Sequence, residues 1–288
     1  GVPEVMRHLR AAGLLRENVR TVSGRTLGEN LDWWEKSERR TRLRAKLRAL
    51  DGIDADDVIL SPAAARARGL TSTITFLGGN LAPEGAVVKS TAIAPELIGA
   101  DGLYRHHGPA RVFTSEASAI AALKAGRLKP GDVLVLMGIG PGSGMPETYQ
   151  ITSALKHLRD GQRIALVTDG RFSGVSTGAC VGHVSPDAWA GGPLARVRDG
   201  DLIELRIDTR GLEGQVNVTG VDPMAFNARG LHPDLKPDPR VPADTRLWAT
   251  LQAACGGAWG GCVHDADRIA RLLELGLEAE RSRSGRTG

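Results

Sequence analysis

Two side chains with catalytic potential lie in neighbouring glycine-rich turns of this sequence. Glu147 follows the run GIGPGSGMP, and Ser173 lies in the run TDGRFSGVSTG. Glycines in such turns adopt positive φ angles and let a ligand come close to the backbone. A carboxylate can bind a hard cation such as Mg²⁺, and a turn serine can present its hydroxyl beside backbone N–H groups. The stretch from Gly138 to Gly192 therefore predicts a site for a small anionic ligand.

Each of these two residues also has a purely structural interpretation. Glu147 follows Pro146 and is expected in the first turn of a helix, where a carboxylate stabilises the helix dipole. Ser173 can simply bond its own turn. The sequence around Ser173 does not match the G-x-S-x-G elbow, and the first turn lacks the Gly-Lys-Ser/Thr ending of a P-loop. A backbone nest for a carboxylate is therefore favoured over acyl transfer or nucleotide binding.

Composition and charge exclude several classes of function. The net charge is +4, but the densest basic run, residues 39–48, lacks the aromatic residues typical of nucleic-acid binding. We expect a solvated helix face or a subunit contact there and no nucleic-acid partner. No apolar run approaches the length of about 18 to 20 residues that spans a membrane, so no membrane partner is expected.

The cysteines are few and odd in number, which predicts the reducing cytoplasm rather than a disulfide framework. Cys255, Cys262 and His264 form a C-x₆-C-x-H pattern that fits no common zinc site, so buried thiols are expected. Cys180 precedes an apolar residue and is expected in the core. His183 can bond locally or belong to the site.

The positions of these residues depend on elements that the hydrophobic pattern predicts. Residues 2–50 are expected to be helical with a break at 22–28, and residues 52–69 to form a connector. From residue 71 short strands are expected at 74–77, 86–89, 110–113, 133–137, 164–168, 194–197, 202–207 and 215–218.

Helices are expected to alternate with these strands. Ser115 is expected to cap one helix, and Pro146 to open another that closes at Gly161. Further helices are expected at 187–190, 244–254 and 266–275, followed by a frayed tail from Glu278. The pattern predicts an α/β fold: a closed or strongly curled mixed sheet with helices packed outside it.

Four motifs in this order resemble the family of dihydroxy-acid and 6-phosphogluconate dehydratases. They are NLAPEGAVVK (80–89), GPGSGMPE (140–147), VTDGRFSG (167–174) and GHVSPDAWAGGPLARVRDGD (182–201). The opening GVPEVMRHLRAAGLL resembles the end of that family's N-terminal domain. The runs GSGMPETYQITSALKHL and DTRLWATLQAACGGAWGGCVHDADRI are similar to the sugar-acid branch that acts on D-xylonate.

The resemblance implies a fold and an incomplete site. It implies a helical end of an otherwise missing N-terminal α/β domain with a connector over residues 1–70, and a β-barrel-like swivelling domain with a helical tail over residues 71–288. Glu147 would be a Mg²⁺ ligand and Ser173 the base that removes the C2 proton of the substrate. Further substrate-binding residues are expected at Gly142, Ser143, Gly144, Thr168 and Gly174.

The resemblance also implies groups that lie outside these residues. An iron–sulfur cluster, 2Fe-2S or 4Fe-4S, would be held by cysteines upstream of Gly1, so the fragment alone is expected to be inactive. A homodimer or homotetramer with a small sugar-acid substrate is expected. Two alternatives stay open: a branched-chain dihydroxy-acid dehydratase, and an inactive or assembly module that lacks the cluster half.

Overall fold

The computed structural model describes residues 1–68, 70, 72–236, 242–255 and 257–284. The chain divides into two compact units, residues 1–71 and residues 72–288. Each unit has its own elements and is described by itself.

The first unit is helical. Its helices are α1 (Val2–Ala11), α2 (Leu27–Lys36), α3 (Glu38–Asp51), α4 (Ala55–Val58) and α5 (Pro62–Ala67). Helix α2 begins with a capping box in which Thr26 and Glu29 bond each other's backbone N–H groups. The break between α1 and α2 is longer than expected, and the predicted connector contains the short helices α4 and α5. The side chains of Asp54 and Ser61 cap the N-termini of α4 and α5, which accounts for these two short helices.

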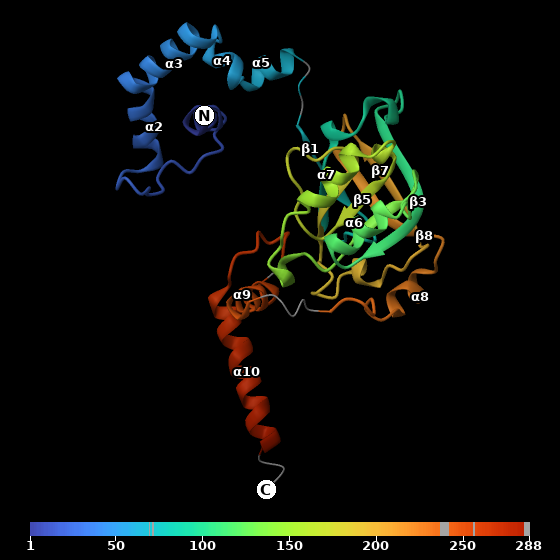
Figure 1. Ribbon diagram of the computed structural model, residues 1–288. Helices are drawn as coiled ribbons and strands as arrows, with labels where there is room; N and C mark the ends of the chain where they lie inside the picture. The colour runs from blue at the N-terminus through green and yellow to red at the C-terminus, as the bar shows by residue number, and fades with distance from the viewer. Residues whose placement is uncertain (69, 71, 237–241, 256, 285–288) are drawn as a thin grey trace. The chain divides into compact units, whose positions relative to one another are not determined.

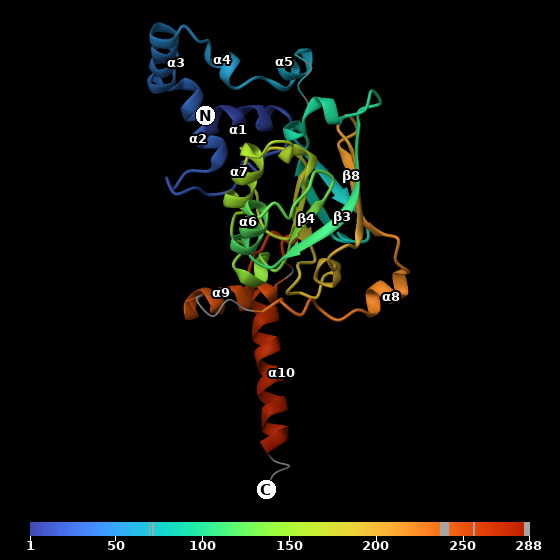
Figure 2. The same ribbon diagram turned by 45° about the vertical axis from the view of Figure 1, so that its right-hand side comes forward.

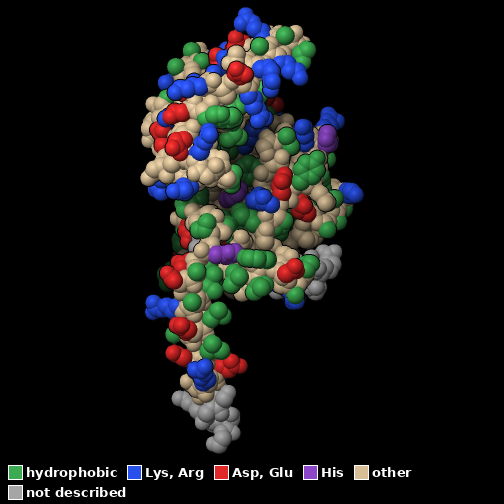
Figure 3. Space-filling view, turned by 90° about the vertical axis from the view of Figure 1, so that its left-hand side faces the viewer, with side chains coloured by type: hydrophobic (Ala, Val, Ile, Leu, Met, Phe, Trp, Pro, Cys, Tyr) green, Lys and Arg blue, Asp and Glu red, His purple; other side chains and the backbone are tan. Residues whose placement is uncertain are grey.

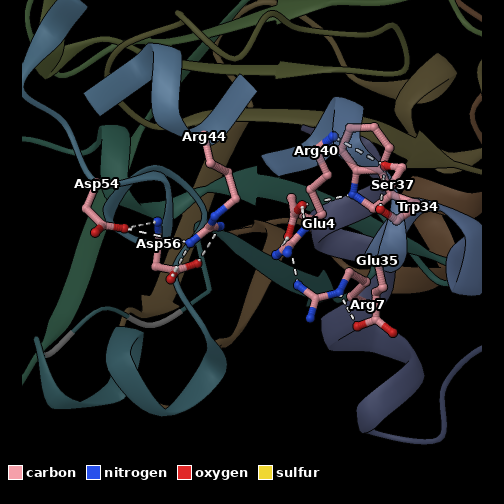
Figure 4. Close-up of polar contacts among 9 residues, drawn as sticks. All are labelled: Glu4, Arg7, Trp34, Glu35, Ser37, Arg40, Arg44, Asp54 and Asp56. Carbon is pink, nitrogen blue, oxygen red and sulfur yellow. Dashed lines mark hydrogen bonds and ion pairs between the residues drawn. The ribbon is translucent and has the colours of Figure 1, made fainter. Parts of the chain in front are cut away.

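The partly buried carboxylate of Glu4 links α1, α2 and α3 through hydrogen bonds (Figure 4). Glu4 accepts hydrogen bonds from Trp34 Nε1 at 2.9 Å, Arg40 Nε at 2.7 Å and Arg7 Nη1 at 2.8 Å. The Arg40 guanidinium is the main cause that lowers the pKa of Glu4 to about 2. Because its partners come from three helices, this side chain fixes the helices against one another.

The second unit contains a closed barrel of eight strands within the described residues (Figures 1 and 2). The order around the barrel is β1-β2-β6-β5-β4-β3-β7-β8. The neighbouring pairs β3–β4, β4–β5, β5–β6 and β1–β8 are parallel, and the other pairs are antiparallel. The strands are β1 (Ile74–Gly78), β2 (Gly85–Lys89), β3 (Leu103–Phe113), β4 (Val133–Leu136), β5 (Ala165–Thr168), β6 (Cys180–Ser185), β7 (Leu202–Asp208) and β8 (Glu213–Thr219).

Alternation along β4 and β5 builds two hydrophobic cores. Val133 and Val135 belong to the core inside the barrel, whereas Leu134 and Leu136 belong to a second core on its outer face. Helices α6 (Glu116–Lys124) and α7 (Tyr149–His157) lie side by side over that outer face (Figures 1 and 2). Because successive side chains of a strand point to opposite faces, four apolar residues in a row serve both cores.

The predicted α/β fold with a barrel-like sheet and outer helices is confirmed, with corrections to single elements. The expected strand at 194–197 is the 3-10 helix η5 (Pro193–Arg196), which Pro193 opens. Residues 187–190 form a turn instead of a helix. Strand β6 was not expected, because Gly182 and His183, which has a φ of 55°, interrupt its apolar pattern. Short 3-10 turns complete the connections: η1 (Ser90–Ala92), η2 (Pro95–Leu97), η3 (Pro141–Ser143) and η4 (Gly161–Arg163).

Three helices follow the barrel strands: α8 (Pro223–Ala228), α9 (Ala243–Ala253) and α10 (Ala266–Ser284). Helix α10 runs nine residues beyond its expected end at residue 275, so the prediction of a frayed tail from Glu278 is wrong as far as Ser284. Hydrophobic side chains are interspersed with acidic and basic ones along its surface (Figure 3). Within the described residues, no helix is both long and apolar enough to cross a membrane.

Candidate functional site

The two glycine-rich turns leave the barrel at the same end. Strands β4 and β5 are parallel, and their last residues, Leu136 and Thr168, are partners in the ladder. The turn that carries Glu147 follows β4, and the turn that carries Ser173 follows β5. Parallel strands bring their carboxyl ends to one edge, which is the usual place for a ligand in such sheets.

A buried aspartate joins both turns to a third loop. The carboxylate of Asp169 accepts hydrogen bonds from the backbone N–H groups of Gly138 at 3.0 Å, Ile139 at 3.0 Å and Ala188 at 2.9 Å. Asp169 is fully buried, and this burial raises its pKa to about 6 against the opposing effect of the three donors. Asp169 therefore fixes the positions of three loops at the site end of the barrel.

Arg171 connects the second turn to the first. Its backbone carbonyl accepts from the N–H of Thr148 at 2.8 Å, and its Nε donates to the carbonyl of Met145 at 2.7 Å. The same segment forms an isolated parallel bridge between Glu147 and Arg171. Glu147 therefore lies in an extended segment before α7, and the prediction that it occupies the first helical turn is wrong. The bridge holds residues 146–148 extended, so the helix begins only at Tyr149.

Ser173 is half-buried, two residues beyond this bridge. Its Oγ accepts a hydrogen bond from the backbone N–H of Val175 at 3.2 Å. The ammonium group of Lys89 donates to the neighbouring carbonyl of Gly174. The N–H donor of Val175 favours negative charge on the serine oxygen.

Glu147 lies in the wall of a pocket of about 490 Å³ beside the first turn. Its side chain is exposed, and among the described residues it has no ion-pair partner. Ser173 is not among the described residues that line this pocket. The bridge at Arg171 thus makes the two turns neighbours.

The other residues expected to bind substrate fall into two groups. Gly142 and Ser143 line the pocket with Glu147, and Gly144 ends η3 in the left-handed region at a φ of 83°. Thr168 is fully buried, and its Oγ1 accepts from the N–H of Gly170 at 3.0 Å, so its hydroxyl stabilises the second turn. The carbonyl of Gly174 is the acceptor for Lys89.

The cysteines occupy separate environments. Cys180 lies in the outer core, as expected, and burial raises the pKa of its thiol. Cys255 is buried and its Sγ accepts from the N–H of Asp265 at 3.1 Å, while Cys262 is half-buried, with its Sγ 3.9 Å from the sulfur of Met145. Across residues 1–284, apart from the undescribed positions, no group of three or more His, Cys, Asp or Glu residues could hold a metal ion. These thiols therefore do not fit an iron–sulfur cluster.

His183 lies beside the second turn. Its ring meets that of Phe172 edge to face, with ring centroids 6.2 Å apart. Burial lowers the pKa of His183, and the charge of Arg171 lowers it further. The neutral imidazole therefore predominates near pH 7.

Asp169 and Arg171 are the residues that the sequence interpretation missed. Both lie inside the run TDGRFSG that drew attention to Ser173. The available signal was an acidic residue directly after a mostly apolar strand, where a buried carboxylate needs backbone donors.

Comparison with known proteins matches residues 58–245 to the family model described as dihydroxy-acid/6-phosphogluconate dehydratase C-terminal. The chain belongs to this family. It is 57% identical over 285 residues to the D-xylonate dehydratase YjhG of Escherichia coli (strain K12), which covers 95% of this chain and 44% of that protein. The expected resemblance, including its sugar-acid branch, is thereby confirmed.

Two further relatives match most of this chain. The D-xylonate dehydratase YagF of Escherichia coli (strain K12) is 53% identical, over 97% of this chain and 44% of its own length. The dihydroxy-acid dehydratase of Solidesulfovibrio magneticus is 42% identical, over 77% of this chain and 36% of its own length. The chain thus spans less than half the length of the curated relatives that it matches.

Proposed function

We propose that this chain supplies Glu147 and Ser173 to the active site of a hydro-lyase that dehydrates a sugar acid of the D-xylonate type. The observation that carries this proposal is the 57% identity, over nearly the whole chain, to a protein named D-xylonate dehydratase. The bridge between the two glycine-rich turns at Arg171 supports this proposal, because Glu147 and Ser173 then lie at the same end of the barrel.

In the proposed reaction, Ser173 removes the proton from C2 of the 2,3-dihydroxy acid. The C3–O bond then breaks, and the departing hydroxide takes up one proton, which balances the proton removed by Ser173, and leaves as water. The resulting enol tautomerises to the 2-keto-3-deoxy acid. A serine oxygen is a base only as the alkoxide, which requires stabilisation. The Val175 N–H, which donates to the Oγ of Ser173, supplies one such stabilising contact in this turn.

The surroundings of Glu147 fit a Mg²⁺ ligand. Its carboxylate is exposed in a pocket wall and is not neutralised by any described cation in an ion pair. Mg²⁺ binds to proteins through one or two carboxylates and completes its shell with water or substrate oxygens. Bound there, it would stabilise the negative charge that develops on the substrate carboxylate and C2 oxygen. The remaining ligands would come from other residues of the complete protein.

The iron–sulfur cluster stays a prediction, and we derive no step through it because the described thiols do not fit one. The homo-oligomeric state and a cytoplasmic location also stay predictions. Two alternatives remain testable: a branched-chain dihydroxy-acid substrate, which the 42% identity to dihydroxy-acid dehydratases favours, and a module without activity of its own.

The test compares substrates on the complete product of the gene that encodes this chain. D-xylonate and 2,3-dihydroxyisovalerate are supplied in parallel, and the 2-keto product of each is measured. We expect kcat/KM to be at least 10-fold higher for D-xylonate. A preference for dihydroxyisovalerate would support the branched-chain alternative, and absence of turnover with both would support the inactive module.

A further inference from the structure

The pocket beside Glu147 has a second wall that comes from the C-terminal part of the chain. Arg246 and Thr250 of α9 line it together with Lys236 and with Gly142 and Ser143 of the first glycine-rich turn. Trp189 also lines it, and its indole Nε1 donates to the carbonyl of Gly138 at 3.0 Å. The pocket therefore combines cationic, hydroxyl and carboxylate groups around an aromatic side chain.

Helix α9 is fixed against the glycine-rich turn. Ala249 is only 5% exposed, and α9 packs directly on η3, which contains Gly142 and Ser143. Arg246 and Thr250 are one turn apart and share a helix face. The Oγ1 of Thr250 donates to the carbonyl of Arg246 at 2.8 Å, which leaves its lone pairs for another donor.

The cations of this wall are available for a ligand. Arg246 is exposed, and neither it nor Lys236 forms an ion pair with any residue in the described part of the chain. A guanidinium presents a planar fork of N–H donors, which suits two neighbouring oxygen atoms of one ligand. The pocket volume of about 490 Å³ is that of a small-molecule site.

Arg246 and Thr250 lie beyond the part of the chain that is common to the family. The family model ends at residue 245. The two D-xylonate dehydratases align with 95% and 97% of this chain, whereas the dihydroxy-acid dehydratases align with 74% to 82%. The part of the second wall that comes from Arg246 and Thr250 therefore lies outside the residues matched by the family model.

We propose that α9 is the specificity element of the site, with Arg246 and Thr250 binding the hydroxyl groups beyond C3 of a sugar acid. Branched-chain dihydroxy acids have alkyl groups in that position and offer no partner for these donors and acceptors. A site built to bind a hydroxyl rejects an analogue that lacks it, because its own polar groups lose their partner. This inference rests on the proposed dehydratase function.

The test uses Arg246→Met in the complete gene product, because Met retains length and helix propensity but removes every donor. The matched control is Arg271→Met, an exposed arginine on α10. We expect kcat/KM for D-xylonate to fall about 10- to 100-fold in the Arg246 variant, as for a lost hydrogen bond to a charged group. For 2,3-dihydroxyisovalerate we expect a change of less than about 3-fold, and for the control about 2-fold or less with both substrates.

The outcomes separate the inference from the function on which it rests. If the unmodified protein turns over D-xylonate but Arg246→Met is unchanged, or loses both substrates equally, the specificity role is wrong. If the unmodified protein does not turn over D-xylonate, the proposed function itself fails. Where dihydroxyisovalerate is not turned over, its inhibition constant replaces its kcat/KM. If Arg246→Met does not fold, Thr250→Val, which has nearly the same shape as the original residue, replaces it. We then expect kcat/KM to fall several-fold for D-xylonate alone, and an unchanged value would contradict the specificity role.

Discussion

Replacing Asp169 with Asn should have a cost that depends on pH. The carboxylate accepts from three backbone N–H groups, two on Oδ2 and one on Oδ1. In the favourable orientation the Asn oxygen keeps the two donors from Gly138 and Ala188, and its NH₂ group faces the N–H of Ile139. One buried donor is then unsatisfied, which costs about 1–3 kcal/mol.

Near neutral pH the buried charge of Asp169 destabilises the unmodified protein, which offsets the cost of the unsatisfied donor in the Asn variant. The pKa of Asp169 is about 6 in the folded protein and 3.8 as an ordinary value, so the folded state binds the proton more tightly. The carboxyl group therefore favours folding below its unfolded pKa, and this contribution is lost as pH rises from 3.8 through about 6. A shift of that size corresponds to about 3 kcal/mol. Asn avoids this loss, so its net cost should be about 2 kcal/mol lower at pH 7.5 than at pH 4.5.

The assay is urea denaturation of the Asp169→Asn variant and the unmodified chain at both pH values. The control is Asp222→Ala, which removes an exposed N-cap with one donor and should cost about 1 kcal/mol at either pH. A cost that is larger at pH 7.5 than at pH 4.5 would refute the reasoning. It would mean that the three donors outweigh burial and keep the carboxylate ionised.

Three further predictions concern the same fold and site. Glu4→Gln should lower the free energy of unfolding of the helical unit by about 1 kcal/mol at pH 7, measured by calorimetry. Because the folded pKa of Glu4 is lowered to about 2, this contribution should be present above pH 4.5 and vanish as pH falls through about 2, and equal costs at pH 7 and pH 2 would contradict it. Glu147→Gln should raise the Mg²⁺ concentration for half-maximal turnover of the complete gene product at least 10-fold, with unchanged thermal stability; an unchanged Mg²⁺ requirement would remove Glu147 from the metal site. Gly142→Ala should cost about 1–3 kcal/mol in a urea titration, because the added Cβ would lie 2.5 Å from the Cβ of Trp189, and a neutral result would show that this contact adjusts freely.

Local sequence patterns predicted most barrel strands because apolar alternation follows directly from burial. Strand β4 is an example: VLVL serves the inner core with Val133 and Val135 and the outer core with Leu134 and Leu136. Strand β6 could not be predicted in this way, since its position depends on partners in β2 and β5 that are distant in sequence. Pairing with those partners overrides the weak propensity of its glycine and its left-handed histidine.

In the candidate site, too, local patterns predicted some features, whereas others depend on contacts between distant parts of the sequence. Glycines and a motif identified the turns of Glu147 and Ser173, but no local pattern could show that Arg171 joins them. That junction includes two hydrogen bonds across 23 positions of sequence, which the backbone N–H and the Oγ1 of Thr148 donate to the carbonyl of Arg171. The pocket wall from α9 was also beyond prediction, because it depends on how a C-terminal helix packs on η3.

The most direct test of the central claim is the kcat for D-xylonate of the complete gene product carrying Ser173→Ala. Loss of a general base reduces turnover about 10²- to 10⁴-fold, so we expect a fall within that range and a KM within about 3-fold of the original. Ser282→Ala, an exposed serine on α10, is the control and should retain full activity. A Ser173→Ala variant that retains kcat within 10-fold would contradict the assignment of Ser173 as the base.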